Sequence, residues 1–262
     1  MKHKLLMILV IVSLALLLGC VPQQVPEETP EGTGVEEGRV VFTITDAAAN
    51  MSAVTSIMVT VDSVQVHSAE KGWVTVSSEQ KTYDLLQLKA EASHGLLADV
   101  MLEEGTYQQV RLDISNVVVV DAAGEHEAKL PSGELKIVGD LVVTADSTST
   151  ASFDFIADES LHVTGQGEYI LAPVVQLETR EDAEVDLKAD SKVEIKNGRV
   201  RANVKVGMDA EGNVGIGLGI SAKANVSISQ GKIKVDIGIG KGKKEMDDNA
   251  DAEADVEVGI GY

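Results

Sequence analysis

Alternation of apolar and polar residues recurs through the middle of the chain and predicts β-strands. The pattern has a period of two over residues 39–45, 56–66, 73–76, 107–120, 152–156 and 169–177. Its phase slips at Asp62-Ser63, which indicates a β-bulge. Residues 81–88 are the one stretch where a short helical turn competes with a strand. We therefore expect an all-β domain over residues 38–180.

Aromatic residues are concentrated in this expected domain, which holds seven of the eight in the chain. Large aromatic side chains dominate the buried volume of most domains. We therefore expect them to form the core rather than a ligand platform: Phe42, Trp73, Tyr83, Tyr107, Phe153, Phe155 and Tyr169.

Residues 181–262 alternate as strictly but are rich in glycine and contain one aromatic residue, Tyr262. Asn197-Gly198 tolerates positive φ at both positions and predicts a two-residue hairpin turn. Further hairpins are expected at 209–213 and at Gln230-Gly231, between strands at 214–220, 222–228 and 232–240. This part of the chain is predicted to be a Gly-rich antiparallel β-meander.

Glycine alternates with aliphatic residues at 215–220 and 237–240, so one face of each segment carries almost no side chain. Such glycines often mark the close approach of another backbone. Two interpretations stay open. The segments could form a self-association or ligand-stacking surface, or an amphipathic sheet that covers the first domain or itself; we favour the second.

The first 37 residues resemble the leader and tether of a bacterial-type lipoprotein. Lys2 and Lys4 precede an apolar run at 5–18, which suits a signal peptide better than a membrane span. Leu17-Leu18-Gly19-Cys20 resembles a lipobox, so we expect a signal peptide at 1–19 and a lipid on Cys20. The alternatives are an ordinary cleaved signal or an uncleaved anchor. Residues 20–37 are rich in proline and glutamate and are expected to form an extended tether.

Charge limits the partners. The leader contains two lysines, so its removal leaves 20 basic against 42 acidic side chains, a formal charge of −22. Nucleic acid is excluded as a ligand on this ground, and adsorption to an anionic membrane is disfavoured. Attachment to the membrane would therefore depend on the lipid of Cys20, and the protein would be extracytoplasmic. With its one thiol acylated, the chain would have no cysteine for disulfides or metal binding.

Motifs of catalysis or metal binding are missing from the sequence. None of GxSxG, HExxH, GxxxxGK[ST] and CxxC occurs, and His67, His94, His126 and His162 share no metal-ligand spacing. Oxygen ligands at 247, 249 and 251 start an EF-hand-like pattern, which fails at Ala252 and Val258. A solvated acidic loop is the better interpretation of residues 245–257. Calcium is thus a weakly supported partner, and no metal or cofactor site is predicted.

Three aspartates remain as candidate oxygen ligands, although capping of turns is the simpler role. They are Asp46, Asp154 and Asp158. Two N-x-S sequons, at Asn50 and Asn225, permit glycosylation without demonstrating it.

The order of short motifs between residues 38 and 178 resembles the family catalogued as domain of unknown function 4382, found in surface lipoproteins. The motifs are VFTITD (41–46), Trp73, YDLL (83–86), GTY (105–107), VRL (110–112), LPS (130–132), LKI (135–137), FDF (153–155) and YILAPV (169–174). Ala48 departs from the family, which tends to have proline there. The resemblance implies a Greek-key β-sandwich and an envelope location but no catalytic residue. Residues 105–111 also resemble the turn and strand of transthyretin-like modules.

These observations favour a non-enzymatic module that is anchored by lipid and binds an envelope protein or glycan. Contacts would be expected in loops 47–53, 67–72 and 122–129, at the ends of the sandwich. One alternative is a structural envelope protein that associates through its C-terminal sheet. A second is a polymer hydrolase that uses scattered carboxylates such as Asp46, Asp113 or Asp154.

Overall fold

The fold is described from a computed structural model, which defines residues 35–46, 51, 53–221 and 224–236. The predictions about the signal peptide, Cys20, Asn50, the strand residues 237–240 and the acidic loop at 245–257 lie outside these residues, as does the predicted tether up to residue 34. The last tether residue, Glu37, already belongs to a strand. The described chain is mostly β-structure, which confirms the predicted all-β class.

Six strands form the first sheet, in the order β12-β9-β1-β5-β13-β14, and β12 also pairs with β13. Strand β1 is antiparallel to β5 and parallel to β9. The bounds are β1 (Glu37–Thr45), β5 (His94–Glu103), β9 (Thr148–Phe155), β12 (Val174–Leu187), β13 (Lys192–Met208) and β14 (Val214–Gly215).

The second sheet has the order β3-β2-β6-β7, with β4 paired to β2 and β8 paired to β6. Its strands are β2 (Val54–Ser68), β3 (Gly72–Ser77), β4 (Lys81–Asp84), β6 (Gly105–Asp121), β7 (Gly124–Glu127) and β8 (Glu134–Val143). The register of β2 against β6 shifts on either side of Val61, which places an irregularity at the predicted bulge.

Short elements complete the described chain. Two small hairpins consist of β10 (Leu161–Val163) with β11 (Tyr169–Leu171), and β15 (Asn225–Ser229) with β16 (Lys232–Asp236). The helical turns are α2 (Leu85–Ala90), α3 (Ala157–Ser160) and η1 (Ala189–Ser191). The ambiguous stretch at 81–88 is thus strand followed by helix, divided at Asp84, whose carboxylate caps α2.

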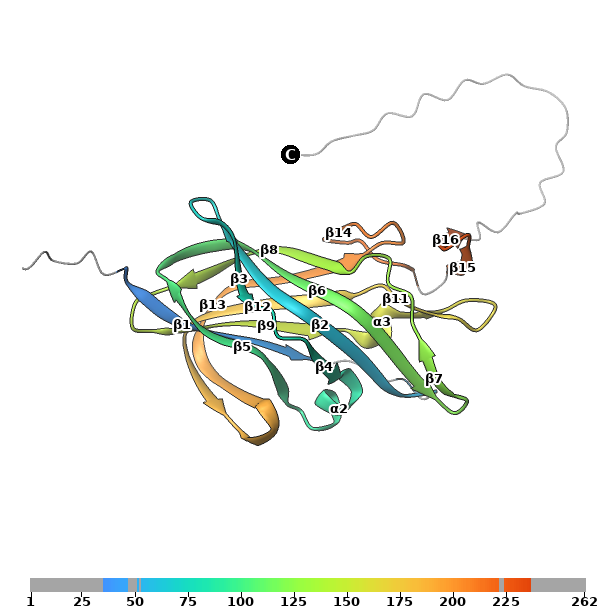
Figure 1. Cartoon of the computed structure of the whole chain (residues 1–262), viewed down its shortest axis with the longest axis horizontal. Helices are drawn as coiled ribbons and strands as arrows, with labels where there is room; N and C mark the ends of the chain where they lie inside the picture. Colours follow the sequence, from blue (N-terminus) through green and yellow to red (C-terminus); the bar gives the residue numbers. More distant parts are fainter. Residues whose placement is uncertain (1–34, 47–50, 52, 222–223, 237–262) are drawn as a thin grey trace, which may run out of the picture. The chain divides into compact units, whose positions relative to one another are not determined.

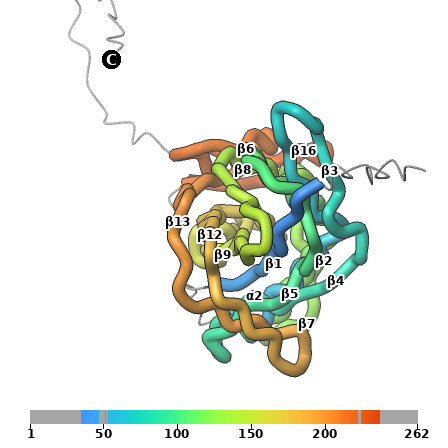
Figure 2. The backbone as a smooth tube through the Cα atoms, turned by 90° about the vertical axis from the view of Figure 1, so that its left-hand side faces the viewer, coloured from blue at the N-terminus to red at the C-terminus, as the bar shows by residue number. Residues whose placement is uncertain are grey.

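The two sheets pack face to face around one large core (Figures 1 and 2). In the end view, β2 and β3 lie on the right and β9, β12 and β13 on the left. Phe42, Phe153 and Phe155 of the first sheet are fully buried against side chains such as Leu112 and Ile137 of the second. The layers are sandwich-like, while the Greek-key connection implied by the family resemblance stays a prediction.

The predicted aromatic core is correct except at the outer strand β3. Five of the seven aromatic side chains are buried, and Tyr83 packs partly buried against the core. Trp73 is instead 36% exposed. Its neighbours Val74 and Val76 point to the core, so the pleat turns Trp73 to the outer face.

The hairpin turn predicted at Asn197-Gly198 is wrong, because β12 and β13 form a longer hairpin that turns elsewhere. Both residues have the expected positive φ, at 55° and 81°, but they lie inside β13, where Ala183 of β12 faces Asn197. The chain reverses earlier, at η1, so that Leu187 pairs with Val193. A turn at η1 lets the two strands pair along most of their length. Strand β12 also passes residue 180 without a break, although the sequence predicts a division there.

The glycine-alternating segment at 214–220 is not the predicted strand. Strand β14 ends at Gly215, and Gly217 and Gly219 then take positive φ of 74° and 144°. The predicted turn at 209–213 is present, and Gln230-Gly231 forms the predicted turn between β15 and β16. Close backbone approach does occur here, but at Gly207: a Cβ on this residue would lie 2.0 Å from the carbonyl oxygen of Leu218.

Candidate binding site

A polar pocket lies on the first sheet, on the face turned away from the large core. Ile44, Phe153 and Leu177 point into that core, so by alternation Thr45, Asp154 and Glu178 point to the opposite face. Register brings them together, because Thr45 pairs with Asp154, and Asp154 with Gln176. The pocket has a volume of about 390 Å³ and is lined by Thr45, Asp46, Lys89, Ala92, His94, Ser152, Asp154, Gln176 and Glu178.

Carboxylates dominate this pocket, which we call the β1–β9–β12 pocket. Asp46 is 1% exposed. Asp154 comes from β9, which pairs with β1, and Glu178 comes from β12, on the other side of β9. Glu178 accepts a hydrogen bond of 2.7 Å from Nε of Arg180, whose Nη1 donates to the carbonyl of Asn197. Arg180 thus joins Glu178 of the pocket to the backbone of β13 at Asn197.

His94 contributes the one imidazole of the pocket lining. Burial lowers the pKa of its imidazole, the carboxylates of Asp154 and Glu178 oppose this effect, and Arg180 adds to it. The imidazole is therefore neutral at pH 7 and offers one donor and one acceptor. Behind it, Thr43 Oγ1 donates to Ser152 Oγ at 2.9 Å inside the protein, which fixes the hydroxyl of the lining serine.

The structure divides the aspartates that the sequence offered as catalytic or ligand residues. Asp46 and Asp154 line the same pocket. Asp113 lies on the second sheet, where it accepts hydrogen bonds from Ser63 Oγ and from Gln65 Nε2. Asp158, in α3, lines a different hollow.

The other three histidines lie apart from one another and outside this pocket. His67 packs edge-on against Trp73, and His126 Nε2 lies 3.0 Å from Asp121 Oδ1. Burial lowers the pKa of His162, which lies in β10. In the part of the chain that the structure covers, no three His, Cys, Asp or Glu side chains are grouped as metal ligands. The described residues therefore offer no metal centre.

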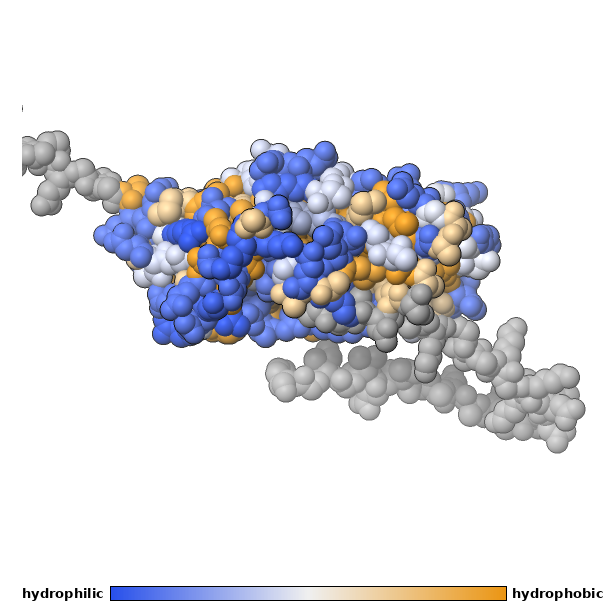
Figure 3. Space-filling model, turned by 90° about the horizontal axis from the view of Figure 1, so that it is seen from below, coloured by the Kyte–Doolittle hydropathy of each residue, from blue (hydrophilic) through white to orange (hydrophobic). Residues whose placement is uncertain are grey.

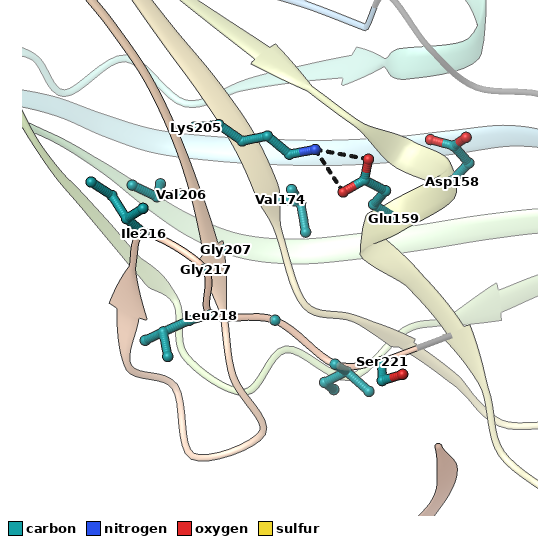
Figure 4. Close-up of a pocket in the computed structure, with 12 residues that line it drawn as sticks. Asp158, Glu159, Val174, Lys205, Val206, Gly207, Ile216, Gly217, Leu218 and Ser221 are labelled. Carbon is teal, nitrogen blue, oxygen red and sulfur yellow. Dashed lines mark hydrogen bonds and ion pairs between the residues drawn. The ribbon is translucent and has the colours of Figure 1, made fainter. Parts of the chain in front are cut away.

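The second hollow lies between β13, α3 and the turn after β14 (Figure 4). Its volume is about 640 Å³, and its walls carry the exposed side chains of Ile216 and Leu218. Lys205 spans it to pair with Glu159 at 2.8 Å, as the dashed lines show. Seen from below, the described surface has hydrophobic side chains in several patches between hydrophilic areas (Figure 3). The hollow is thus an open groove with an ion pair across it.

Sequence reasoning missed Gln176, Glu178 and Lys89 as pocket residues. Alternation in strand 174–178 could have shown that Gln176 and Glu178 share a face. The pairing of β12 with β9, which brings them to Asp154, cannot be read from spacing. Asn225, the sequon among the described residues, is exposed at the start of β15.

Comparisons with known proteins identify a family but no characterised relative. Among the described residues, no helix has the length and apolar character needed to cross a bilayer. No curated protein and no solved structure matches the chain. The model of one family, described as a domain of unknown function (DUF4382), matches residues 37–173. That range covers more than half of the 262 residues, and the chain therefore belongs to the DUF4382 family.

Proposed function

We propose that the protein is a lipid-anchored, extracytoplasmic binding protein and that the β1–β9–β12 pocket holds its ligand. The leader, Cys20 and the tether support the location. The main support for the binding role is the pocket itself. It is a polar hollow on paired strands, in a domain whose large core is hydrophobic. A site on strands is held more rigidly than one on loops, so less entropy is lost when a ligand binds.

The lining indicates the chemistry of the ligand. Asp46, Asp154 and Glu178 contribute three carboxylates to the lining. The ammonium group of Lys89 and the guanidinium of Arg180, which pairs with Glu178, offset two of these charges, so the pocket keeps a net negative charge. An anion would be repelled, whereas an amine or quaternary ammonium group would be attracted. Ser152, Gln176 and neutral His94 add hydrogen-bonding groups for a polar body. A volume of about 390 Å³ suits a small molecule.

Binding can be tested by calorimetry with putrescine, spermidine, choline and lysine as cationic probes, and with citrate and phosphate as anionic ones. We expect a cation to bind and the anions not to. Asp154→Asn should weaken the cation at least tenfold, about 1.4 kcal/mol. Glu127→Gln makes the same change of charge on an exposed residue of β7 and should leave binding unchanged. No binding of any cation, or equal losses in both variants, would refute the proposal.

A second candidate function is hydrolysis of a surface polymer, which is favoured only by the presence of Asp46 and Asp154 in one pocket. Glycosidases use two carboxyl groups about 5–10 Å apart, one protonated and one ionised. Incubation with polysaccharides and an assay for new reducing ends would test it. Activity that Asp154→Asn abolishes would replace binding with catalysis as the role of the pocket.

A further inference from the structure

Trp73, the only tryptophan of the chain, marks a second surface on the outer face of the second sheet. Strand pairing sets Trp73 opposite His67, His67 opposite Gln109, and Gln109 opposite Val138. These four side chains form one row across β3, β2, β6 and β8. At about 4.8 Å between strands, the row is about 14 Å long. Two neighbouring rows lie beside it, one of Gln65, Arg111 and Lys136 and one of Ser63, Asp113 and Glu134. We call the three rows together the Trp73 face.

A hydrogen-bonded network fixes the side chains beside this row. Arg111 Nη1 donates to Glu134 at 2.7 Å, and its Nη2 donates to Gln65 Oε1 at 2.6 Å. Gln65 Nε2 donates in turn to Asp113 at 3.0 Å, and Ser63 Oγ donates to the same carboxylate. The network spans β8, β6 and β2. Its planar groups are therefore ordered before any ligand arrives.

The indole ring rests on this network. The guanidinium carbon of Arg111 lies 4.2 Å from the ring centroid, within the range of a cation–π contact. The imidazole of His67 meets the ring edge-on, with 5.1 Å between centroids. Even so, 36% of Trp73 stays exposed, and Val138 at the far end of the row is 67% exposed. Packing thus explains how the ring is held but leaves much of its surface open.

Charge distinguishes the Trp73 face from the rest of the molecule. The chain as a whole has a formal charge of −20. Beside the row, Arg111 and Lys136 balance Asp113 and Glu134, which lie in the neighbouring rows of the same strands. Asp140, exposed two residues after Val138 on the same face of β8, adds one negative charge at the end of the row. Because charges of both signs lie close together, the face suits a ligand without net charge better than a cation or an anion.

From these observations we propose that the Trp73 face binds a neutral glycan. The C–H groups on one side of a pyranose ring form an apolar patch that stacks on an indole, and its hydroxyl groups both donate and accept hydrogen bonds. Trp73 would carry one ring, Gln109 would meet hydroxyl groups along the row, and Lys136 would meet them from the neighbouring row. A length of about 14 Å accommodates roughly three sugar units side by side across the strands. This site is separate from the β1–β9–β12 pocket.

The single tryptophan makes the test direct, because all indole fluorescence comes from the proposed site. The full chain is purified in a detergent without a sugar headgroup and titrated with cellohexaose, mannohexaose and chitohexaose. We expect at least one of them to shift the emission and to protect Trp73 from quenching by acrylamide. Oligogalacturonate serves as the charged comparison and should bind more weakly.

Variants measured by calorimetry then assign the binding to the face. Trp73→Ala should weaken the glycan at least tenfold, and Trp73→Phe, which keeps an aromatic ring, should weaken it less. Val163→Ala removes methyl groups from a side chain that is 54% exposed on β10 and should change nothing. Asp154→Asn should also leave glycan binding intact, which separates this site from the pocket. The proposal fails if no neutral oligosaccharide protects Trp73, if oligogalacturonate binds best, or if folded Trp73→Ala and Trp73→Phe both bind like the wild type.

Discussion

Replacement of Glu181 by glutamine tests whether β12 and β13 are an integral part of the domain. Glu181 lies in β12 and is 6% exposed. Its carboxylate accepts a hydrogen bond of 2.8 Å from Thr144, in the turn between β8 and β9. Arg199 Nη2 at 2.9 Å and Arg201 Nε at 2.6 Å, both from β13, also donate to it. One side chain thus connects the part of the chain within the family match to the part beyond it.

The expected loss of stability follows from these contacts. A hydrogen bond to a charged group contributes about 1.5–3 kcal/mol, but the side chains of Arg199 and Arg201 are 60% and 35% exposed, so solvent screens their share. We expect Glu181→Gln to lower the free energy of unfolding by about 2 kcal/mol, or Tm by about 4–8 °C. Glu184→Gln, an exposed position of the same strand, should change it by less than about 0.5 kcal/mol.

The pH dependence of stability, measured by urea unfolding at several pH values, provides an independent check on the role of Glu181. The hydrogen bond from Thr144, followed by those of Arg201 and Arg199, lowers the pKa of the Glu181 carboxyl. A lowered pKa stabilises the fold above the pKa of the unfolded state, about 4.3, and this contribution is lost as the pH falls. The gap between wild type and Glu181→Gln should therefore narrow below about pH 4. Equal stability of Glu181→Gln and Glu184→Gln at pH 7 would refute the reasoning.

Three further predictions concern other parts of the fold. Asp84→Ala should cost about 1–2 kcal/mol in urea unfolding, because it removes the N-cap of α2, whereas Asp84→Asn should largely retain it. Gly207→Ala should cost about 1–3 kcal/mol, since the added Cβ meets the carbonyl of Leu218 and no side chain can move to relieve the clash. Burial lowers the pKa of His94 and His162, so the folded state resists their protonation and stability should fall between about pH 7 and 5. A double replacement of both histidines by glutamine should flatten that dependence, and an unchanged slope would contradict it.

Period-two alternation was sufficient to predict an all-β fold, because half-buried strands repeat every second residue. It also contained the position of Trp73: Val74 and Val76 point to the core, so the residue before each of them points away. From its residue type alone, Trp73 was instead expected in the core with the other aromatic residues. For this residue, the alternation of side chains along the strand predicts burial better than the hydrophobicity of the indole does.

Contacts between strands that are distant in the chain could not be predicted from the sequence. Phe153-Asp154-Phe155 implies that Asp154 faces away from the core, but only the pairing of β9 with β1 and β12 brings it to Thr45 and Gln176. Asn197-Gly198 illustrates the same limit. Its positive φ follows from residue type, whereas its use inside β13 depends on where β12 reverses.

We propose that a lipid on Cys20 holds this β-structured domain outside the cytoplasmic membrane. Mass spectrometry of the N-terminal peptide from membrane-extracted protein would detect that lipid. We expect a peptide that begins at Cys20 and carries the added mass of a diacylglyceryl group. A peptide that retains residues 1–19, or one that begins at Cys20 with an unmodified thiol, would contradict it.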